Sequence, residues 1–388
     1  MKQYKLGDVC NIVSGGTPSR SNSLYWNGGT IPWIKIGNIS KKYVDSADEF
    51  ITQEGLDGSS AKMLPAGTIL YTIFATLGEV GILKIDACTN QAIAGLTIKN
   101  PEQVRTDYIY YYLKSKKSYV SNIGRGVAQN NINMSMLRDF DIPLPTIEEQ
   151  DEIVSVLERT ASVIEARKTE LDKLDELVKA RFVEMFGNPV TNEKGWPSKF
   201  LSELTTKIGS GATPKGGKES YREEGITLIR SMNVHNGEFD YKDLAHISDE
   251  QAAKLDGVTI EPNDVLLNIT GASVARSCVV PNEILPARVN QHVCIIRCKE
   301  HVIPEFLNKL LIDDNYQSLL WSIAGSGATR EAITKQQVEE LQIILPPITT
   351  QKEFVEFVKQ VDKSKVEVQK ALEETQLLFD SLMQEYFG

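Results

Sequence analysis

Residues 145–187 read PTIEEQDEIVSVLERTASVIEARKTELDKLDELVKARFVEMFG, and residues 346–388 read PPITTQKEFVEFVKQVDKSKVEVQKALEETQLLFDSLMQEYFG. The two stretches align without a gap at a constant offset of 201 residues. The positions shared by both copies are Pro145, Ile147, Gln150, Glu152, Val154, Leu171, Leu177, Glu184, Phe186 and Gly187, which recur as Pro346, Ile348, Gln351, Glu353, Val355, Leu372, Leu378, Glu385, Phe387 and Gly388. The chain therefore contains an internal repeat, and this repeat decides how the rest of the sequence is divided.

Both copies have the pattern of a long amphipathic helix. Strong helix formers dominate, and no proline follows the first few positions of either copy. Apolar residues recur every seven positions over about four heptads, which is typical of a coiled coil. At about 1.5 Å per residue, each helix would be roughly 60 Å long. A stripe of that length needs a partner, so we expect the two copies to pack on each other. The alternative is two unrelated surface helices.

The predicted helix-packing positions are apolar in both copies. In the first copy they are Leu157, Ile164, Leu171 and Val178, and in the second they are Val358, Val361, Leu372, Phe379 and Leu382. Charged residues interrupt this pattern at Lys365 and lie beside it at Arg167 and Arg181.

The bulk properties indicate a globular protein of two or three domains. The chain has 388 residues, of which 41% are hydrophobic and 24% are charged. No apolar run approaches the roughly 18 residues of a membrane span. The first ten residues, MKQYKLGDVC, lack the apolar core of a signal peptide. We therefore expect a cytoplasmic protein without a membrane partner.

The net charge of −10 is concentrated in the repeated helices. Residues 146–187 carry 11 acidic and 6 basic residues, and residues 347–388 carry 8 acidic and 5 basic residues. The remaining segments are close to neutral, so basic patches on them are compatible with the acidic total. Bulk charge neither supports nor excludes nucleic-acid binding.

The remaining segments predict two α/β (α+β) units with the same order of landmarks. The paired landmarks are a Ser-Gly-(Gly/Ala)-Thr-Pro loop (14–18 and 210–214), a strand (31–36 and 226–230), a buried strand (68–74 and 265–270), an Asn-Gln dipeptide (90–91 and 290–291), a helix (107–121, with Thr106 as N-cap, and 304–323) and a Gly-rich loop (124–131 and 325–330). The predicted domains are 1–145 and 188–346, each followed by a long helix, 146–187 and 347–388.

No constellation of catalytic or metal-binding residues is recognisable in the sequence. The stretch 212–219, ATPKGGKE, lacks the first Gly and the Ser/Thr of a phosphate-binding loop. The histidines have no zinc-ligand spacing, and we expect Cys294 and Cys298, near His292, to be buried thiols rather than metal ligands. We therefore expect a binding protein with no catalytic residue, no metal and no cofactor.

This arrangement resembles the specificity (S) subunits of type I restriction–modification enzymes. The resemblance covers essentially the whole chain. It rests on PLPTIEEQ (143–150) and its echo LPPITTQ (345–351), on the duplicated Ser-Gly-x-Thr-Pro loops, and on the Gly-rich loop before a short helix in each unit. Each motif alone is weak, but the duplicated order is fairly specific.

The resemblance implies both a fold and a set of partners. Two similar target recognition domains would be separated by two long antiparallel coiled-coil-like helices, which gives a pseudo-two-fold internal repeat. Each domain would bind one half of a split, asymmetric double-stranded DNA sequence. The helices would dock two methyltransferase (M) subunits, and the complex would recruit translocase/endonuclease (R) subunits. The interrupting charges at Lys365, Arg167 and Arg181 are expected to face methyltransferase rather than the opposite helix.

Candidate DNA-binding residues are the polar and basic side chains on or near the Gly-rich loops. Phosphates are bound by Lys, Arg and backbone N–H groups, whereas base edges are read by Arg, Asn and Gln. The candidates are Arg20, Lys35, Arg125, Gln129 and Asn130 in the first unit and Lys215, Arg230, Asn233, Arg276 and Arg330 in the second. The Asn-Gln dipeptides either contribute to this surface or stabilise a strand turn.

Two other classes of function remain open on the sequence alone. One is a structural scaffold whose coiled coil brings two non-DNA partners together, for which any DNA binding would be insensitive to salt. The other is an enzyme, such as a methyltransferase with its own recognition domain. The chain lacks the (Asn/Asp)-Pro-Pro-aromatic tetrapeptide of amino-methyltransferases, which speaks against that class.

Overall fold

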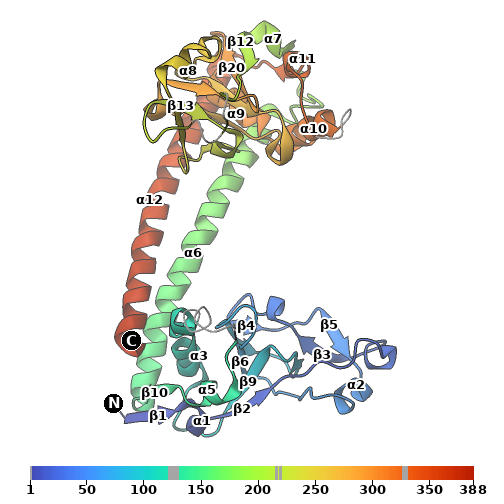
Figure 1. Ribbon diagram of the computed structural model, residues 1–388, viewed down its shortest axis with the longest axis vertical. Helices are drawn as coiled ribbons and strands as arrows, with labels where there is room; N and C mark the ends of the chain where they lie inside the picture. Colours follow the sequence, from blue (N-terminus) through green and yellow to red (C-terminus); the bar gives the residue numbers. More distant parts are fainter. Residues whose placement is uncertain (1, 121–130, 215–216, 218–220, 326–330) are drawn as a thin grey trace. The chain divides into compact units, whose positions relative to one another are not determined.

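The computed structural model describes residues 2–120, 131–214, 217, 221–325 and 331–388 (Figure 1). The chain forms two compact units, residues 1–168 with 369–388 (unit 1) and residues 169–368 (unit 2). Both units combine helices and sheets, and the elements recur in the same order. The predicted mixed α/β architecture with an internal repeat and two long helices is confirmed.

Unit 1 is built on a five-stranded sheet and a smaller three-stranded sheet. The five-stranded sheet has the order β2 (Cys10–Ser14), β9 (Ile93–Ile98), β6 (Ile69–Thr72), β7 (Val80–Leu83) and β4 (Tyr43–Val44). The three-stranded sheet has the order β5 (Glu49–Ile51), β3 (Ile31–Ile34) and β8 (Cys88–Thr89), and a separate antiparallel pair joins β1 (Lys2–Lys5) to β10 (Asp141–Leu144). The helices are α1 (Leu6–Val9), α2 (Gln53–Asp57), α3 (Thr106–Ser115) and α5 (Met134–Arg138).

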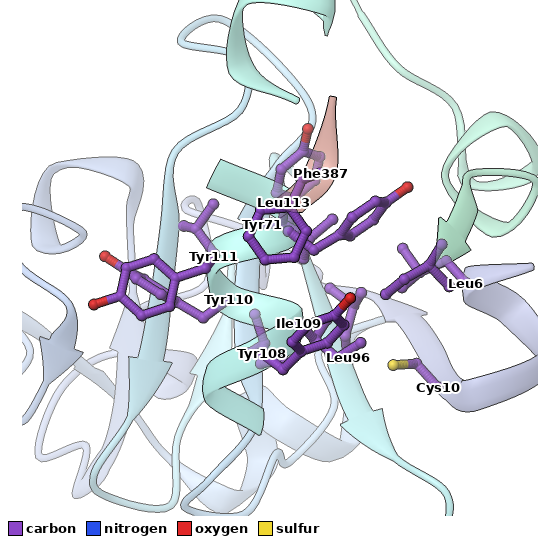
Figure 2. Packing of buried hydrophobic residues seen from close by; sticks show 14 of the residues in the cluster. Leu6, Cys10, Tyr71, Leu96, Tyr108, Ile109, Tyr110, Tyr111, Leu113 and Phe387 are labelled. Atoms are coloured by element: carbon purple, nitrogen blue, oxygen red, sulfur yellow. The ribbon is translucent and has the colours of Figure 1, made fainter. Parts of the chain in front are cut away.

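Helix α3 is the centre of the core of unit 1. All six residues from Tyr108 to Leu113 are buried, so the middle of this helix is enclosed on every side (Figure 2). The Tyr108 and Tyr112 hydroxyls donate to the carbonyls of Pro143 (2.7 Å) and Asp141 (2.9 Å), which satisfies polar groups that burial would otherwise leave unpaired. Thr106 is the first helical residue and Arg105 is the N-cap, so the predicted cap was wrong by one position.

Unit 2 repeats the plan with a four-stranded and a three-stranded sheet. The first has the order β12 (Thr205–Ser210), β20 (Val293–Cys298), β17 (Val265–Asn268) and β18 (Ser277–Val279), and the second has the order β16 (Ala245–Ile247), β13 (Ile226–Ile229) and β19 (Ala287–Val289). Two antiparallel pairs join β11 (Ser198–Phe200) to β21 (Gln342–Ile344) and β14 (Val234–His235) to β15 (Glu238–Phe239). The helices are α7 (Leu201–Leu204), α8 (Asp249–Ala253), α9 (Pro304–Leu311), α10 (Asp314–Gly325) and α11 (Lys335–Glu339).

The single helix predicted over residues 304–323 is in fact two helices. Helix α9 ends at Leu311 and α10 begins at Asp314. The Asp313 carboxylate accepts hydrogen bonds from the backbone N–H groups of Asn315 (2.9 Å) and Tyr316 (3.3 Å). A carboxylate in this position caps a new helix and therefore breaks the old one.

The two repeated helices are α6 (Ile147–Phe186) and α12 (Ile348–Phe387), each of 40 residues. In unit 1, Leu157 and Ile164 of α6 join Phe379 and Phe387 of α12 in one apolar core. In unit 2, the rings of Phe182 and Phe186 lie 5.5 and 5.3 Å from that of Phe354, between ring centroids. In both units the start of one helix meets the end of the other, so the helices pack in antiparallel fashion.

Burial along the predicted seam is not uniform. Leu157, Ile164, Val178, Val358, Val361 and Phe379 are buried, whereas Leu171, Leu372 and Leu382 are half-buried. Lys365 donates to the Asp175 carboxylate on the opposite helix (2.7 Å), and Arg181 reaches Glu353 (3.3 Å). The expectation that these two charges face away from the opposite helix was therefore wrong.

The repeated Pro-x-x-x-x-Gln motif anchors each long helix to its unit. The Gln150 side chain is fully buried; its Oε1 accepts from the Arg105 N–H (2.9 Å), and its Nε2 donates to the carbonyls of Gln103 (2.9 Å) and Pro145 (3.1 Å). Gln351 makes the same three bonds, to Ile303 N–H (3.0 Å) and to the His301 (3.1 Å) and Pro346 (2.9 Å) carbonyls. The motif thus ties the start of α6 to the start of α3 and the start of α12 to the start of α9.

Within the described ranges, no helix combines the length and apolar character needed to cross a membrane.

Candidate functional site

Four chain segments of unit 1 converge at the ends of its strands. The backbone bonds that join them run from Gly15 N–H to the Ile93 carbonyl (3.1 Å), from Asn90 N–H to the Ile34 carbonyl (3.1 Å) and from Ile73 N–H to the Ala92 carbonyl (2.8 Å). They bring together the residues that follow β2, β3 and β6 with those that precede β9. We define the strand-end cluster of unit 1 as Thr17, Lys35, Phe74 and Gln91.

Unit 2 forms the corresponding cluster with two equivalent bonds and one that differs, since Gly211 donates to Asn290 whereas its counterpart Gly15 donates to Ile93. They run from Gly211 N–H to the Asn290 carbonyl (3.1 Å), from Asn290 N–H to the Ile229 carbonyl (3.0 Å) and from Ile269 N–H to the His292 carbonyl (3.0 Å). The strand-end cluster of unit 2 is accordingly Thr213, Arg230, Thr270 and Gln291. The two clusters therefore share one backbone framework.

Glycine in the Ser-Gly-x-Thr-Pro loops is required by close approach of the backbone. A Cβ added at Gly15 would lie 2.2 Å from the Asn90 carbonyl oxygen, and one at Gly211 would lie 1.7 Å from that of Val289. No side chain fits at either position, so the shared glycine explains how the loop can lie against the Asn-Gln segment.

The Asn-Gln dipeptides divide their roles in the same way in both units. The amide oxygens of Asn90 and Asn290 accept from backbone N–H groups two residues ahead, at 3.1 and 3.0 Å, and so hold the turn. Gln91 and Gln291 are exposed, and their Oε1 atoms accept the hydroxyl hydrogen bonds of Thr17 and Thr213. Asparagine stabilises the turn, whereas glutamine lies at the surface of the cluster.

Arg20 and Lys35 share one carboxylate in unit 1. Glu49 lies 2.6 Å from the Arg20 guanidinium and 2.5 Å from the Lys35 ammonium. The pKa of the Glu49 carboxyl lies below its ordinary value. The hydrogen bond from Arg20 is the largest cause, and the one from Lys35 is the second. The Arg20 guanidinium also stacks on Trp26, 3.7 Å from the ring centroid, and lies 4.9 Å from that of Trp33. Two of the predicted DNA-binding residues are thus adjacent and held in place.

Arg230 occupies in unit 2 the framework position of Lys35. Each directly follows the central strand of its three-stranded sheet, β3 for Lys35 and β13 for Arg230. Each backbone N–H donates to the side chain of an asparagine three residues later, Asn38 (2.9 Å) or Asn233 (3.1 Å). The Arg230 guanidinium lies 5.5 Å from the Tyr221 ring centroid and donates to the Asp243 carbonyl.

Asn233 supports the loop that carries Arg230. It is fully buried, and its Nδ2 donates to the carbonyls of Asp240 (3.0 Å) and Lys242 (3.1 Å). The Asn233 amide therefore bonds to the backbone of its own loop. It does not present a donor and an acceptor at the surface, as recognition of a base would require.

Of the other predicted DNA-binding residues, the structure describes only Arg276. Arg276 is half-buried and precedes β18, directly after Ala275, whose φ is +71°. The remaining predicted residues, Arg125, Gln129, Asn130, Lys215 and Arg330, lie outside the described residues.

The two clusters differ in the residues beside the shared Thr-Gln pair. Unit 1 has Phe74, which is 41% exposed, next to Ala92. At the equivalent positions, unit 2 has Thr270 and His292, whose side chains are 2.5 Å apart (Oγ1 to Nδ1). His292 Nε2 also lies 3.1 Å from the Gln291 amide nitrogen. One cluster is therefore apolar where the other is a row of hydrogen-bonding groups.

Sequence reasoning missed Glu49, Trp26, Thr270 and His292. Glu49 and Trp26 join a site through partners distant in the chain, so no local pattern marks them. Thr270 and His292 were detectable, because they fall at fixed distances from repeated landmarks and differ between the units.

The described residues offer little for covalent or metal chemistry. They include no group of three or more His, Cys, Asp or Glu side chains placed to hold a metal ion. Burial raises the pKa of the Cys10, Cys278, Cys294 and Cys298 thiols to about 12 and that of Cys88 to about 11. Since the thiolate is the reactive form, these thiols are poor nucleophiles near neutral pH.

Solved structures with the same fold span the whole chain. One, described as the structural basis of complex assembly and conformational transition of the type I R-M system, covers 100% of this chain and 97% of that chain, with a TM-score of 0.65 and 19% identity. The S subunit of a type I restriction–modification system from M. genitalium covers 100% and 96%, with a TM-score of 0.52 and 15% identity.

Curated relatives agree with this fold. The MjaIX specificity subunit of Methanocaldococcus jannaschii is 29% identical over 253 residues, which is 60% of this chain and 58% of that protein. A type I specificity subunit from Escherichia coli is 29% identical over 43% of its own length. This chain thus spans about half the length of these two relatives. The StySPI specificity subunit of Salmonella potsdam is 21% identical over 98% of this chain and 87% of its own length.

The family described as the type I restriction modification DNA specificity domain matches the chain twice, over residues 1–176 and 193–376. Each match includes one strand-end cluster and most of one long helix. The chain therefore belongs to the type I restriction–modification DNA specificity domain family.

Proposed function

We propose that this chain is the sequence-specific DNA-binding subunit of a type I restriction–modification complex. Each strand-end cluster reads one half of a split, asymmetric target in double-stranded DNA. One observation carries the proposal: a closely similar backbone framework presents different side chains in the two units, Lys35 and Phe74 in one and Arg230 and Thr270 in the other. A protein that binds two different half-sites with one scaffold requires this combination.

The recognition domains of this proposal are residues 1–145 and 188–346. Residues 146–187 and 347–388 are the long helices that follow them. The position of the Gln150 and Gln351 anchors, at the junction between each domain and its helix, supports this division.

The long helices dock two methyltransferase subunits in this proposal, and these recruit the translocase/endonuclease subunits. Both helices carry apolar side chains that the packing of the described residues leaves exposed. They are Val156, Val163, Leu177 and Val183 on α6 and Val366, Leu377 and Leu378 on α12. An exposed apolar row on a helix is typical of a protein interface. The chain itself contributes recognition rather than catalysis, which accords with its buried, high-pKa thiols.

The test is a domain exchange in the assembled complex. Residues 1–145 are replaced by the equivalent residues of a family member with a different target, and the methylated sequence is determined by methylome sequencing. We expect one half of the methylated motif to change and the other to persist. A change in both halves, or in neither, would contradict the assignment of one domain to one half-site.

A salt titration separates this proposal from a structural scaffold. Binding through phosphates weakens steeply as salt rises, because bound counterions are released. Binding of target DNA that is weak and insensitive to salt would favour the scaffold.

A further inference from the structure

The Thr-Gln pair is the part of the strand-end cluster that does not change between the units. Thr17 donates to Gln91 in unit 1, and Thr213 donates to Gln291 in unit 2. The neighbouring side chains differ in every case, as Lys35 and Arg230 show. If the cluster binds DNA, a contact common to both units must recognise something that both half-sites contain.

The chemistry of the amide limits what that common feature is. A glutamine that reads adenine uses its oxygen and its nitrogen together, as acceptor and donor. Here a threonine hydroxyl already donates to one of the two acceptor positions of the oxygen, so the N–H groups are the less occupied part of the amide. In unit 1, Gln91 Nε2 shows no hydrogen bond to any of the described residues, and in unit 2 the Gln291 amide nitrogen meets His292 Nε2 at 3.1 Å, which leaves a second N–H.

The surroundings place this donor beside a positive charge. The Asn90 N–H donates to the Ile34 carbonyl, which puts Gln91 one residue from the strand end that carries Lys35. Asn290 makes the same bond to Ile229, before Arg230. An exposed N–H donor next to a cation is a combination that binds phosphate oxygens, and phosphates occur at every step of any DNA sequence.

We propose that Gln91 and Gln291 are matched phosphate-binding residues, held by Thr17 and Thr213, that position each unit on its half-site without reading its bases. This inference rests on the proposed function. It assigns sequence discrimination to the residues that differ between the units and affinity to the pair that is shared.

The test uses the full chain assembled with its methyltransferase subunits and two DNA duplexes. One duplex carries the sequence that the wild-type complex methylates, and the other has both half-sites scrambled. For Gln91→Ala and Gln291→Ala we expect both duplexes to bind about tenfold more weakly, by the same factor, since one hydrogen bond to a charged group is lost. The methylated sequence should stay the same, and so should the salt dependence, because no charge has been removed.

Two further variants sharpen the result. Gln91→Glu keeps the size of the side chain and its bond to Thr17 but replaces the N–H donor with negative charge, so both duplexes should bind more weakly than with Gln91→Ala. The matched controls are Gln53→Ala and Gln336→Ala, two exposed glutamines that bond only within their own helices, to Asp57 and Glu340, and these should leave binding unchanged.

A phosphate contact also predicts that replacing the contacted phosphate of one half-site by methylphosphonate weakens wild-type binding and leaves unaffected the alanine variant of the unit that binds that half-site. Relaxed or altered discrimination at one base pair, or unchanged affinity for both duplexes, would overturn the inference. If instead the wild-type complex binds both duplexes equally and methylates no defined sequence, the proposed function itself fails.

Discussion

The strand-end clusters of the two units have nearly the same backbone and clearly different side chains. Unit 1 presents Lys35, tied to Glu49, beside an exposed Phe74, whereas unit 2 presents Arg230 beside the hydrogen-bonded pair Thr270 and His292. The backbone is preserved because its hydrogen bonds and the close approach at the shared glycine leave no freedom. The outward side chains take no part in those bonds, so they are free to diverge. Constraint and variability are therefore separated within a single loop cluster.

In the long helices, by contrast, the side-chain contacts themselves are similar in the two units. Their packing is alike in both units, and the buried anchors Gln150 and Gln351 make the same three bonds. The proposed docking of equivalent partners on the two helices accounts for this likeness. Four predictions test this contrast between a uniform scaffold and divergent recognition surfaces.

The largest effect is expected in the apolar contacts of the long helices. Leu157→Ala in unit 1 and Phe354→Ala in unit 2 each empty a fully buried site, and each should lower the free energy of unfolding by about 2–5 kcal/mol. The half-buried Leu171→Ala is the matched control and should cost about 1 kcal/mol. Hydrogen exchange of the full chain resolves which unit loses protection. If one of the two buried substitutions cost several kcal/mol in its own unit and the other cost nothing in its own unit, the two helix contacts would not be equivalent.

The next largest effect is expected at the buried glutamines. Gln150→Ala and Gln351→Ala each leave one part-buried N–H and two carbonyls without their side-chain partner, at a cost of about 1–3 kcal/mol. The two losses should match, because the bonds match. Urea unfolding monitored by exchange in α3 and α9 measures them. If one variant proved neutral, the anchoring role would apply to one unit only.

A smaller and selective effect is expected at the divergent cations. Lys35→Ala and Arg230→Ala should each reduce the salt slope of DNA binding by about 1 if the cation contacts phosphate. A contact with a base would instead relax discrimination at one position of one half-site by about 1–3 kcal/mol. Salt titrations and methylome sequencing of the assembled complex distinguish these outcomes. An effect of either variant on both halves of the target would contradict independent recognition.

The smallest effect is expected from pH in unit 1. Because Arg20 and Lys35 lower the pKa of Glu49 in the folded state, the stabilisation is complete above the unfolded-state pKa and is lost as pH falls through the folded pKa. Acid titration below about pH 4.3 should therefore destabilise the wild type slightly more than Glu49→Gln. The effect is modest because the three side chains are partly exposed. Equal acid sensitivity of the two proteins would show that the carboxylate does not stabilise the cation pair.

Much of the scaffold was predictable because its signals are local. The spacing of Leu157, Ile164 and Val178 indicated both the helix and its buried face. The spacing did not indicate how deeply each position is buried, because Leu171 belongs to the same seven-residue series but is half-buried. The break between α9 and α10 was missed although it had a local signal, since aspartate is favoured at helix N-caps over helix interiors and Asp313 caps α10.

The candidate site was predictable in position but not in detail. The repeated landmarks of the sequence were sufficient to place Lys35 and Arg230 at equivalent strand ends. The same reasoning treated Asn233 as a base-reading residue, although the fold buries it in a turn. Polar residue type alone does not reveal whether an amide bonds to its own backbone or faces outward.

The sequence by itself determined the repeat, the two long helices and the matching order of landmarks in the two units, because each depends on periodicity or on a motif written twice; the antiparallel orientation of the helices was only implied by the family resemblance. Only the tertiary structure decided which side chains face the surface and which are held by others. Thr17 meets Gln91 across 74 residues, and Arg20 meets Lys35 through Glu49. Such contacts arise from strand pairing between distant segments, which fixes side-chain direction only after the sheets have formed.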